Sequence, residues 1–311
     1  MNALLLPQQA DGLLPHRAPM LLLDEVVDYR EGTVRANVMI GPDHLFADGD
    51  GELDPVALVE ILAQAAAVLR GCRAKVEEDD EQRIGFLAGL KRMKISSTAR
   101  VGDHLSAEVR QSAAIGQAVV MEGRLSRGGD CLAEGTLNVW EELTGGMANG
   151  ARRAALLGGP SGPTFIQPRA LEGASPIYRA VSAGARQGGL SVEQNEVIGE
   201  FCFDESFAGF QGHFPGFPIL PGIVMLEIVL LLSEHLTCHP MKLAEVERAK
   251  FAGQVRPGES IHARVHLTPF EKDWRIGASI INPASDTLIL KLNATARQVD
   301  SLRADEDSIR S

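Results

Sequence analysis

The chain has 311 residues, of which 45% are hydrophobic, enough for the cores of two ordinary domains. Its formal net charge of -11 argues against a nucleic-acid surface, because phosphate binding needs concentrated positive charge. Its four cysteines show no CxxC pair or metal-ligand spacing, which is typical of reduced thiols in a cytoplasmic protein. We therefore expect a cytoplasmic protein with no metal and no other cofactor.

The first elements of the chain predict a strand, a turn and a long buried helix. The apolar run Leu4–Leu6 lacks a basic lead and ends at Pro7, so we expect no export signal. Residues 34–40 alternate as a strand does, and a Gly-Pro-Asp turn follows. An apolar helix is then predicted over about residues 55–70, interrupted by Glu60 and Gln64. These two lie on one helical face, either lining a common pocket or forming an exposed polar stripe.

Four further strands complete the first unit, which we bound at residues 1–145. They are predicted at residues 84–90, 107–110, 118–125 and 133–140, separated by glycine-containing turns. Residues 146–188 are rich in glycine, alanine, serine and proline with little hydrophobic periodicity, and they predict a linker. A second unit is expected at residues 189–300, followed by a charged tail at residues 301–311.

The second unit contains the most informative stretch, from Gly212 to Gly222. Its glycines and prolines predict a tight loop that holds His213 on stiff backbone and begins a helix over about residues 221–236. The helix is apolar on nearly every face, yet it contains Glu227. A buried carboxylate with a raised pKa is a candidate for acid or base chemistry, although Glu227 can also share an exposed stripe with Glu234. Each half thus has a loop, a buried helix with one acid, and strands, which indicates a divergent internal repeat.

The string from Gly212 to Glu227, with the acid fourteen positions after His213, resembles the active-site signature of the beta-hydroxyacyl-ACP dehydratases of fatty-acid synthesis, the FabZ and FabA group. Residues 13–24, Leu-Leu-Pro-His-Arg-Ala-Pro-Met-Leu-Leu-Leu-Asp, resemble the entry into the first strand of the same family. The resemblance implies an α+β double hotdog, in which two antiparallel sheets each wrap a long central helix and form an internal pseudo-dimer.

In that family each active site takes its histidine from one hotdog and its acid from the other. The first half has Phe46 fourteen positions before Glu60, and the second half has Leu231 where the first has Gln64. The resemblance therefore implies one complete site made of His213, Glu60 and Gln64. The opposite site, Glu227 facing the Phe46 loop, is expected to be degenerate unless His44 rescues it.

Dehydration of a 3-hydroxyacyl thioester needs a base for the proton beside the carbonyl and an acid for the departing hydroxyl, and these roles suit the histidine and the carboxylic acid. The resemblance assigns the oxyanion donor to Gly222. The matched position in the first half is Pro55, which has no N–H, and this is the weakest point of the composite site. Expected substrate contacts are Phe214, Pro215, Gly216, Val59 and Met225.

The implied partner is acyl carrier protein bearing a 4'-phosphopantetheine-linked substrate, with no nucleic acid, no membrane span and an open possibility of homo-oligomers. Because such carriers are acidic and so is this chain, docking needs a local basic patch. The candidates are Lys91, Arg92, Lys94, Arg100, Arg248, Lys250 and Arg256. Two other functions stay open: a hotdog thioesterase or CoA hydratase, and a noncatalytic acyl-binding partner subunit.

Overall fold

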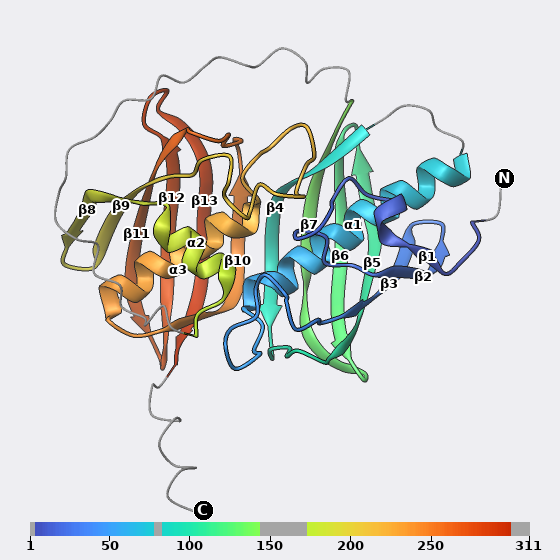
Figure 1. Cartoon of the computed structure of the whole chain (residues 1–311), viewed down its shortest axis with the longest axis horizontal. Coiled ribbons are helices and arrows are strands. Elements are labelled where there is room, and N and C mark those ends of the chain that lie inside the picture. The colour runs from blue at the N-terminus through green and yellow to red at the C-terminus, as the bar shows by residue number, and fades with distance from the viewer. Residues whose placement is uncertain (1–3, 78–82, 144–172, 300–311) are drawn as a thin grey trace, which may run out of the picture.

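A computed structural model of the chain describes residues 4–77, 83–143 and 173–299. Two similar halves lie side by side, and each has a curved antiparallel sheet packed on one long helix (Figure 1). The two sheets join into a single 13-stranded sheet with the order β1-β2-β3-β5-β6-β7-β4-β10-β13-β12-β11-β9-β8. This is the predicted double hotdog, with its two sheets continuous rather than separate.

The elements of the first half follow the predicted order, with longer strands than the sequence indicated. They are β1 (Gln8–Gln9), a 3-10 turn (Ala10–Gly12), β2 (Glu25–Arg30), β3 (Thr33–Met39), α1 (Pro55–Glu77), β4 (Arg83–Ile95), β5 (His104–Ile115), β6 (Ala118–Arg127) and β7 (Asp130–Leu143). The elements of the second half are α2 (Pro176–Ala183), β8 (Ala185–Glu193), β9 (Glu196–Cys202), α3 (Gly222–Thr237), β10 (Met241–Phe251), β11 (Ser260–Phe270), β12 (Asp273–Asn282) and β13 (Thr287–Gln298).

The alternation of buried and less buried side chains along the strands explains why one face of the sheet packs on the helices. β3 and β6 alternate buried and less buried side chains along their length, as expected for strands with one face on a core. The helices α1 and α3 are apolar on most faces because sheet, loops and the other half surround them. α1 is long and apolar enough to resemble a membrane span, but 78% of its apolar window is buried inside the protein, so it is a core helix.

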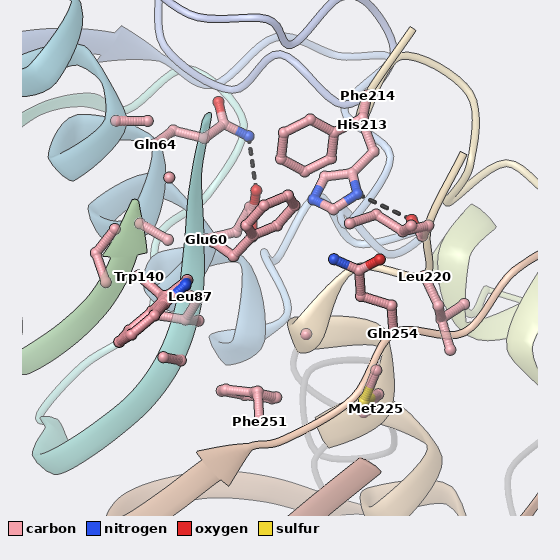
Figure 2. A pocket seen from close by; sticks show the side chains of 18 of the residues that line it. Glu60, Gln64, Leu87, Trp140, His213, Phe214, Leu220, Met225, Phe251 and Gln254 are labelled. Atoms are coloured by element: carbon pink, nitrogen blue, oxygen red, sulfur yellow. Dashed lines mark hydrogen bonds between the residues drawn. The ribbon is translucent and has the colours of Figure 1, made fainter. Parts of the chain in front are cut away.

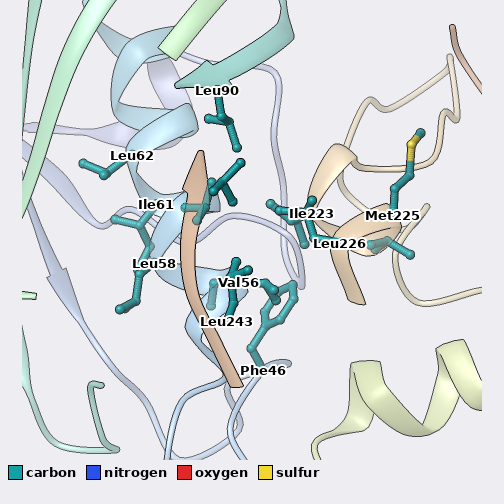
Figure 3. Close-up of a cluster of buried hydrophobic side chains, with 14 of the residues drawn as sticks. Phe46, Val56, Leu58, Ile61, Leu62, Leu90, Ile223, Met225, Leu226 and Leu243 are labelled. Atoms are coloured by element: carbon teal, nitrogen blue, oxygen red, sulfur yellow. The ribbon is translucent and has the colours of Figure 1, made fainter. Parts of the chain in front are cut away.

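The halves meet where β4 pairs with β10, from Glu245 opposite Lys94 to Lys250 opposite Gly89. Behind this junction, buried apolar side chains from both halves form one cluster, which includes Phe46, Val56 and Leu226 (Figure 3). Apolar contact between the halves therefore holds two helices, and the acid on each, in a fixed mutual position.

The predicted linker at residues 146–188 needs a correction in its last part. Residues 146–172 lie outside the described residues, as does the tail at residues 301–311, but α2 and the start of β8 occupy residues 176–188. Ser175 caps α2 by accepting a hydrogen bond from the Tyr178 amide, and Pro176 occupies its first turn. Ile177, Tyr178 and Val181 are buried, so one apolar face stabilises a helix that composition alone did not indicate.

Candidate active site

A cavity of about 380 Å³ opens between the two halves. Its walls come from α1, β4 and β7 of the first half, and from the Gly212–Gly222 loop, α3 and the end of β10 in the second (Figure 2). The residues that line it are His16, Glu60, Ala63, Gln64, Ala67, Gly85, Phe86, Leu87, Ala88, Val139, Trp140, Glu142, His213, Phe214, Ile219, Leu220, Gly222, Met225, Phe251, Ala252, Gly253 and Gln254. The cavity thus depends on both halves. This agrees with the prediction that one half supplies the histidine and the other the glutamate and glutamine.

Glu60 is one of two glutamates that line this cavity, with Glu142, and it is the buried one on α1. It is 4% exposed, and burial raises its pKa to about 7, while the hydrogen bond from Gln64 opposes that rise. The Gln64 amide Nε2 donates to Glu60 Oε1 at 2.9 Å (Figure 2). At pH values below about 7 the carboxyl group is therefore mostly protonated and able to donate a proton. This confirms that Glu60 and Gln64 share a pocket rather than an exposed stripe.

His213 faces Glu60 from the other half. Its Nδ1 lies 3.0 Å from the carbonyl oxygen of Ile219 in the same loop. Because a carbonyl only accepts, Nδ1 carries the proton and Nε2 is left with the lone pair. Burial lowers the pKa of His213 to about 4, so the ring is neutral at physiological pH and available as a base.

His16 is a third polar residue of the cavity, and sequence reasoning did not assign it a role. It lies on a segment that crosses α1, which we call the N-terminal strap (residues 13–22). His16 Nε2 is 3.7 Å from Glu60 Oε1, and its ring meets that of His213 edge-on with 5.1 Å between centroids. The only available signal was the strap's resemblance to the dehydratase family, because no local spacing links His16 to an acid 44 positions later.

The N-terminal strap is held by contacts to both halves. Gln64 donates to the Met20 carbonyl at 2.7 Å and accepts from the Leu22 amide at 2.9 Å. The Arg17 amide donates to the Gly212 carbonyl at 2.7 Å, next to His213. A side chain at Gly212 would meet the Arg17 carbonyl at 2.0 Å, and Gly212 also has a φ of +76, so only glycine fits there. The strap therefore sets the spacing between the acid's helix and the histidine's loop.

Gly222 resolves the difficulty raised by Pro55. Gly222 is the first residue of α3 and lines the cavity on the same side as His213, whereas Pro55 is not among the lining residues. First-turn amides of a helix have no intrahelical acceptor and lie at the positive end of its dipole. The second half therefore supplies both the histidine and a candidate oxyanion donor, so the first helix needs to supply only the acid.

The residues of the expected opposite site lie away from this cavity. Glu227 is buried on α3, and neither it nor His44 reaches the cavity. His44 Nδ1 accepts a hydrogen bond from the Phe46 amide at 3.2 Å, and burial lowers its pKa to about 4. Phe46 itself is fully buried, and α2 packs against this loop through the Ile177 amide and the Leu45 carbonyl, 3.1 Å apart.

The expected substrate contacts divide into two groups. Phe214 and Met225 line the cavity, whereas Pro215, Gly216 and Val59 do not. Pro215 and Gly216 lie on an exposed turn, because the loop reverses direction at Gly216 with a φ of +80 after Phe214 has entered the cavity. Val59 belongs to the fully buried core on another face of α1. The sequence did not identify Phe86, Trp140, Phe251 and Gln254 as lining residues, although the strand that ends at Phe251 resembles a strand of the dehydratase family.

Three polar side chains converge in this cavity. Among the residues that the structure describes, one nitrogen or oxygen atom from each of His16, Glu60 and His213 lies within 4.8 Å of the others. The acid–base roles above need no metal at these atoms.

Comparisons with known proteins agree with this arrangement. A model of ApeP-like dehydratases matches residues 8–145, and one of ApeI-like dehydratases matches residues 190–278. The 3-hydroxyacyl-[acyl-carrier-protein] dehydratase FabZ of Chlamydia trachomatis serovar L2 is 31% identical over 137 residues, which cover 38% of this chain and 88% of that protein. The chain belongs to the FabZ family of dehydratases. An ApeP-like and an ApeI-like dehydratase domain therefore occur in tandem in one polypeptide, in agreement with the predicted internal repeat.

Solved structures support the double hotdog fold. A putative thioesterase from Novosphingobium aromaticivorans is similar with a TM-score of 0.58 and 13% identity, over 88% of this chain and 98% of that chain. The dehydratase domain of RzxB from Pseudomonas fluorescens is similar with a TM-score of 0.52 and 11% identity, over 91% of this chain and 99% of that chain. At these identities the likeness concerns the fold alone.

Proposed function

We propose that this chain removes water from 3-hydroxyacyl thioesters on acyl carrier protein and forms trans-2-enoyl thioesters, in fatty-acid or polyketide-type synthesis. The observation that carries the proposal is the cavity in which His213 of one half faces Glu60 of the other. The two groups have pKa values of about 4 and about 7, so between those values one is a free base and the other a protonated acid. Membership in the FabZ family supports the same reaction.

In this mechanism His213 Nε2 removes the proton from the carbon next to the thioester carbonyl. Negative charge then develops on the carbonyl oxygen, and the Gly222 amide at the positive end of α3 stabilises it. Glu60 donates its proton to the 3-hydroxyl group as the carbon–oxygen bond breaks, and water leaves. The proton gained by His213 and the proton lost by Glu60 balance, so a transfer through water restores the starting state.

The carrier is expected to dock on a basic strip, which we define as Lys91, Arg92 and Lys94 of β4 with Arg248 and Lys250 of β10. All five side chains are exposed, and Lys91 lies opposite Arg248 in the sheet. The two other candidates have partners of their own, because Arg100 pairs with Glu52 at 3.5 Å and Arg256 stacks on the Phe217 ring at 4.6 Å. The strip offers an acidic carrier a local positive field on a negatively charged protein.

The four free cysteines are consistent with a cytoplasmic location.

The reaction is tested by incubating the purified chain with a 3-hydroxyacyl carrier substrate and separating the products by mass spectrometry. If the carrier-bound acyl group becomes lighter by the mass of one water molecule, the reaction is a dehydration. Release of the free acid would instead indicate a thioesterase, and tight binding without turnover a noncatalytic subunit. The variant His213→Ala is expected to abolish enoyl product without reducing carrier binding.

Docking is tested with Lys91→Glu combined with Arg248→Glu. The KM for carrier-bound substrate is expected to rise about tenfold, more steeply at low salt, because charge steers the encounter. A short pantetheine thioester is the matched control, since it lacks the acidic carrier and its KM should not change. Equal KM values for both substrates would place the docking surface elsewhere.

A further inference from the structure

His16 lies where it contacts both reacting groups, yet the mechanism above gives it no task. Its side chain is 6% exposed, with Glu60 on one side and the ring of His213 on the other. The N-terminal strap that carries it is bonded to Gln64 and to Gly212, so His16 cannot move away without breaking contacts to both halves. A buried polar ring held so firmly between an acid and a base calls for a physical account.

The charge of His16 follows from its surroundings. Burial lowers its pKa well below the usual value, and repulsion from His213 and Arg17 lowers it further. The ring is therefore neutral and carries one N–H. Its Nδ1 is buried and has no hydrogen-bond partner among the described residues, whereas Nε2 faces Glu60. Placing the proton on Nε2 aims the donor at the carboxyl group and leaves only an acceptor unsatisfied.

Two N–H groups approach the same oxygen of Glu60. Gln64 donates a hydrogen bond to Oε1 at 2.9 Å, and His16 Nε2 lies 3.7 Å from that atom, beyond hydrogen-bond distance. An oxygen that accepts from Gln64 and has a second N–H directed at it does not hold the acid proton on the same side. These contacts therefore favour the acid proton on Oε2 and bias the plane of the carboxyl group. Contacts of this kind are commonly long without substrate and tighten in the reacting complex.

We propose that His16 is a positioning residue that acts through Glu60: together with Gln64 it holds Oε1 as an acceptor, so that Oε2 delivers the proton to the departing hydroxyl. The inference rests on the proposed function, because it assigns a task within the same reaction. It also explains why the strap must bind both halves. The hydrogen bonds between Gln64 and the strap fix the position of His16 relative to Glu60. The hydrogen bond from Arg17 to Gly212 fixes its position relative to His213.

A pair of variants of nearly equal size tests this role. In His16→Gln the side-chain amide nitrogen reaches the region of Nε2, and in His16→Asn it stops near Nδ1. We expect His16→Asn to lower kcat roughly 10-fold or more with KM changed less than about twofold, and His16→Gln to stay within about threefold of the unaltered enzyme. If His16→Asn fails to fold, His16→Met, which fills the site without a donor, replaces it. Equal kcat values for the donor and donor-free variants would overturn the proposal.

The pH profile adds a readout that a merely structural residue would not move. An N–H donor favours the ionised carboxylate, so its removal raises the pKa of Glu60 and shifts the alkaline limb of kcat/KM to higher pH. The same shift is measured without turnover, by titrating the infrared carbonyl band of protonated Glu60, identified as the band lost in Glu60→Gln. An unmoved midpoint in His16→Asn would reject the contact.

The two measurements separate the proposals. An unaltered enzyme that forms no enoyl product contradicts the proposed function, whereas the infrared midpoint still decides whether His16 acts on Glu60.

Discussion

The helices α1 and α3 occupy equivalent places in the two halves, and each buries one glutamate near its start, but the surroundings of the two acids differ. Glu60 has Gln64 one turn later, His16 above it and an open cavity beside it. Glu227 has Leu231 at the matched position and does not line the cavity. Burial alone therefore does not place an acid at the cavity, because both glutamates are buried and only Glu60 of the two lines it.

The elements that cover the two helices differ in the same way. The N-terminal strap crosses α1 with a polar face, through which Gln64 binds Met20 and Leu22. Over α3 lies α2, whose Tyr178 hydroxyl donates to Glu234 at 2.5 Å while the Met241 amide donates to the same carboxylate at 2.9 Å. These two contacts thus secure helix packing at Glu234, two turns beyond Glu227.

The largest effect is expected from removing each acid in turn. Glu60→Gln should lower kcat by about 10³-fold, because the proton donor is lost while the shape is kept. Glu227→Gln should stay within about twofold, since this residue does not reach the cavity. Single-turnover enoyl formation measures both. Similar losses from the two variants would mean that the chain has two working sites.

The next largest effect concerns the helix starts. Gly222→Pro removes the amide N–H while proline remains acceptable at the first helical position, and kcat should fall about 10²–10³-fold. Gly222→Ala keeps the amide and brings its methyl group 3.0 Å from the Phe251 ring, so it controls for crowding. Pro55→Ala in the first half should leave kcat unchanged. A large loss in Pro55→Ala would move the oxyanion contact to α1.

The pH dependence follows from the pKa values of His213 and Glu60. His213 is the free base above about pH 4, and Glu60 is protonated below about pH 7, so kcat/KM should be highest between those values. Above the upper value the protonated acid falls tenfold per pH unit, giving a loss of about 10²-fold at about pH 9. The Glu60→Gln variant should lose this alkaline limb in its residual activity. A limb that persists there would belong to another group.

A smaller effect is expected from making α1 resemble α3 with Gln64→Leu. This leaves the Leu22 amide and the Met20 carbonyl without their partner, at a cost of about 1–3 kcal/mol for each buried group, and should lower kcat about tenfold. The matched change Leu231→Gln should not create activity. Urea unfolding and turnover measure the two consequences separately. If Gln64→Leu is as stable as the unaltered chain, the strap is held by other contacts.

Much of the site was predictable because the chain resembles the dehydratase family and repeats its parts. The resemblance implied that a histidine from one half meets an acid from the other, and the losses at Phe46 and Leu231 then indicated His213 with Glu60. His16 was not predictable, because its role arises from a tertiary contact between the strap and α1 that no local periodicity records. α2 was missed because its apolar face spans only two turns within a glycine-rich segment. The joining of the sheets through β4 and β10 likewise depends on an encounter of strands far apart in sequence.

The seam between β4 and β10 has a consequence for assembly. As separate proteins, the halves could associate in three ways. A pair of first halves would lack the loop that carries His213, and a pair of second halves would lack Glu60 and Gln64. Covalent fusion gives the two unequal units a permanent one-to-one ratio and favours the mixed pair over both unproductive ones.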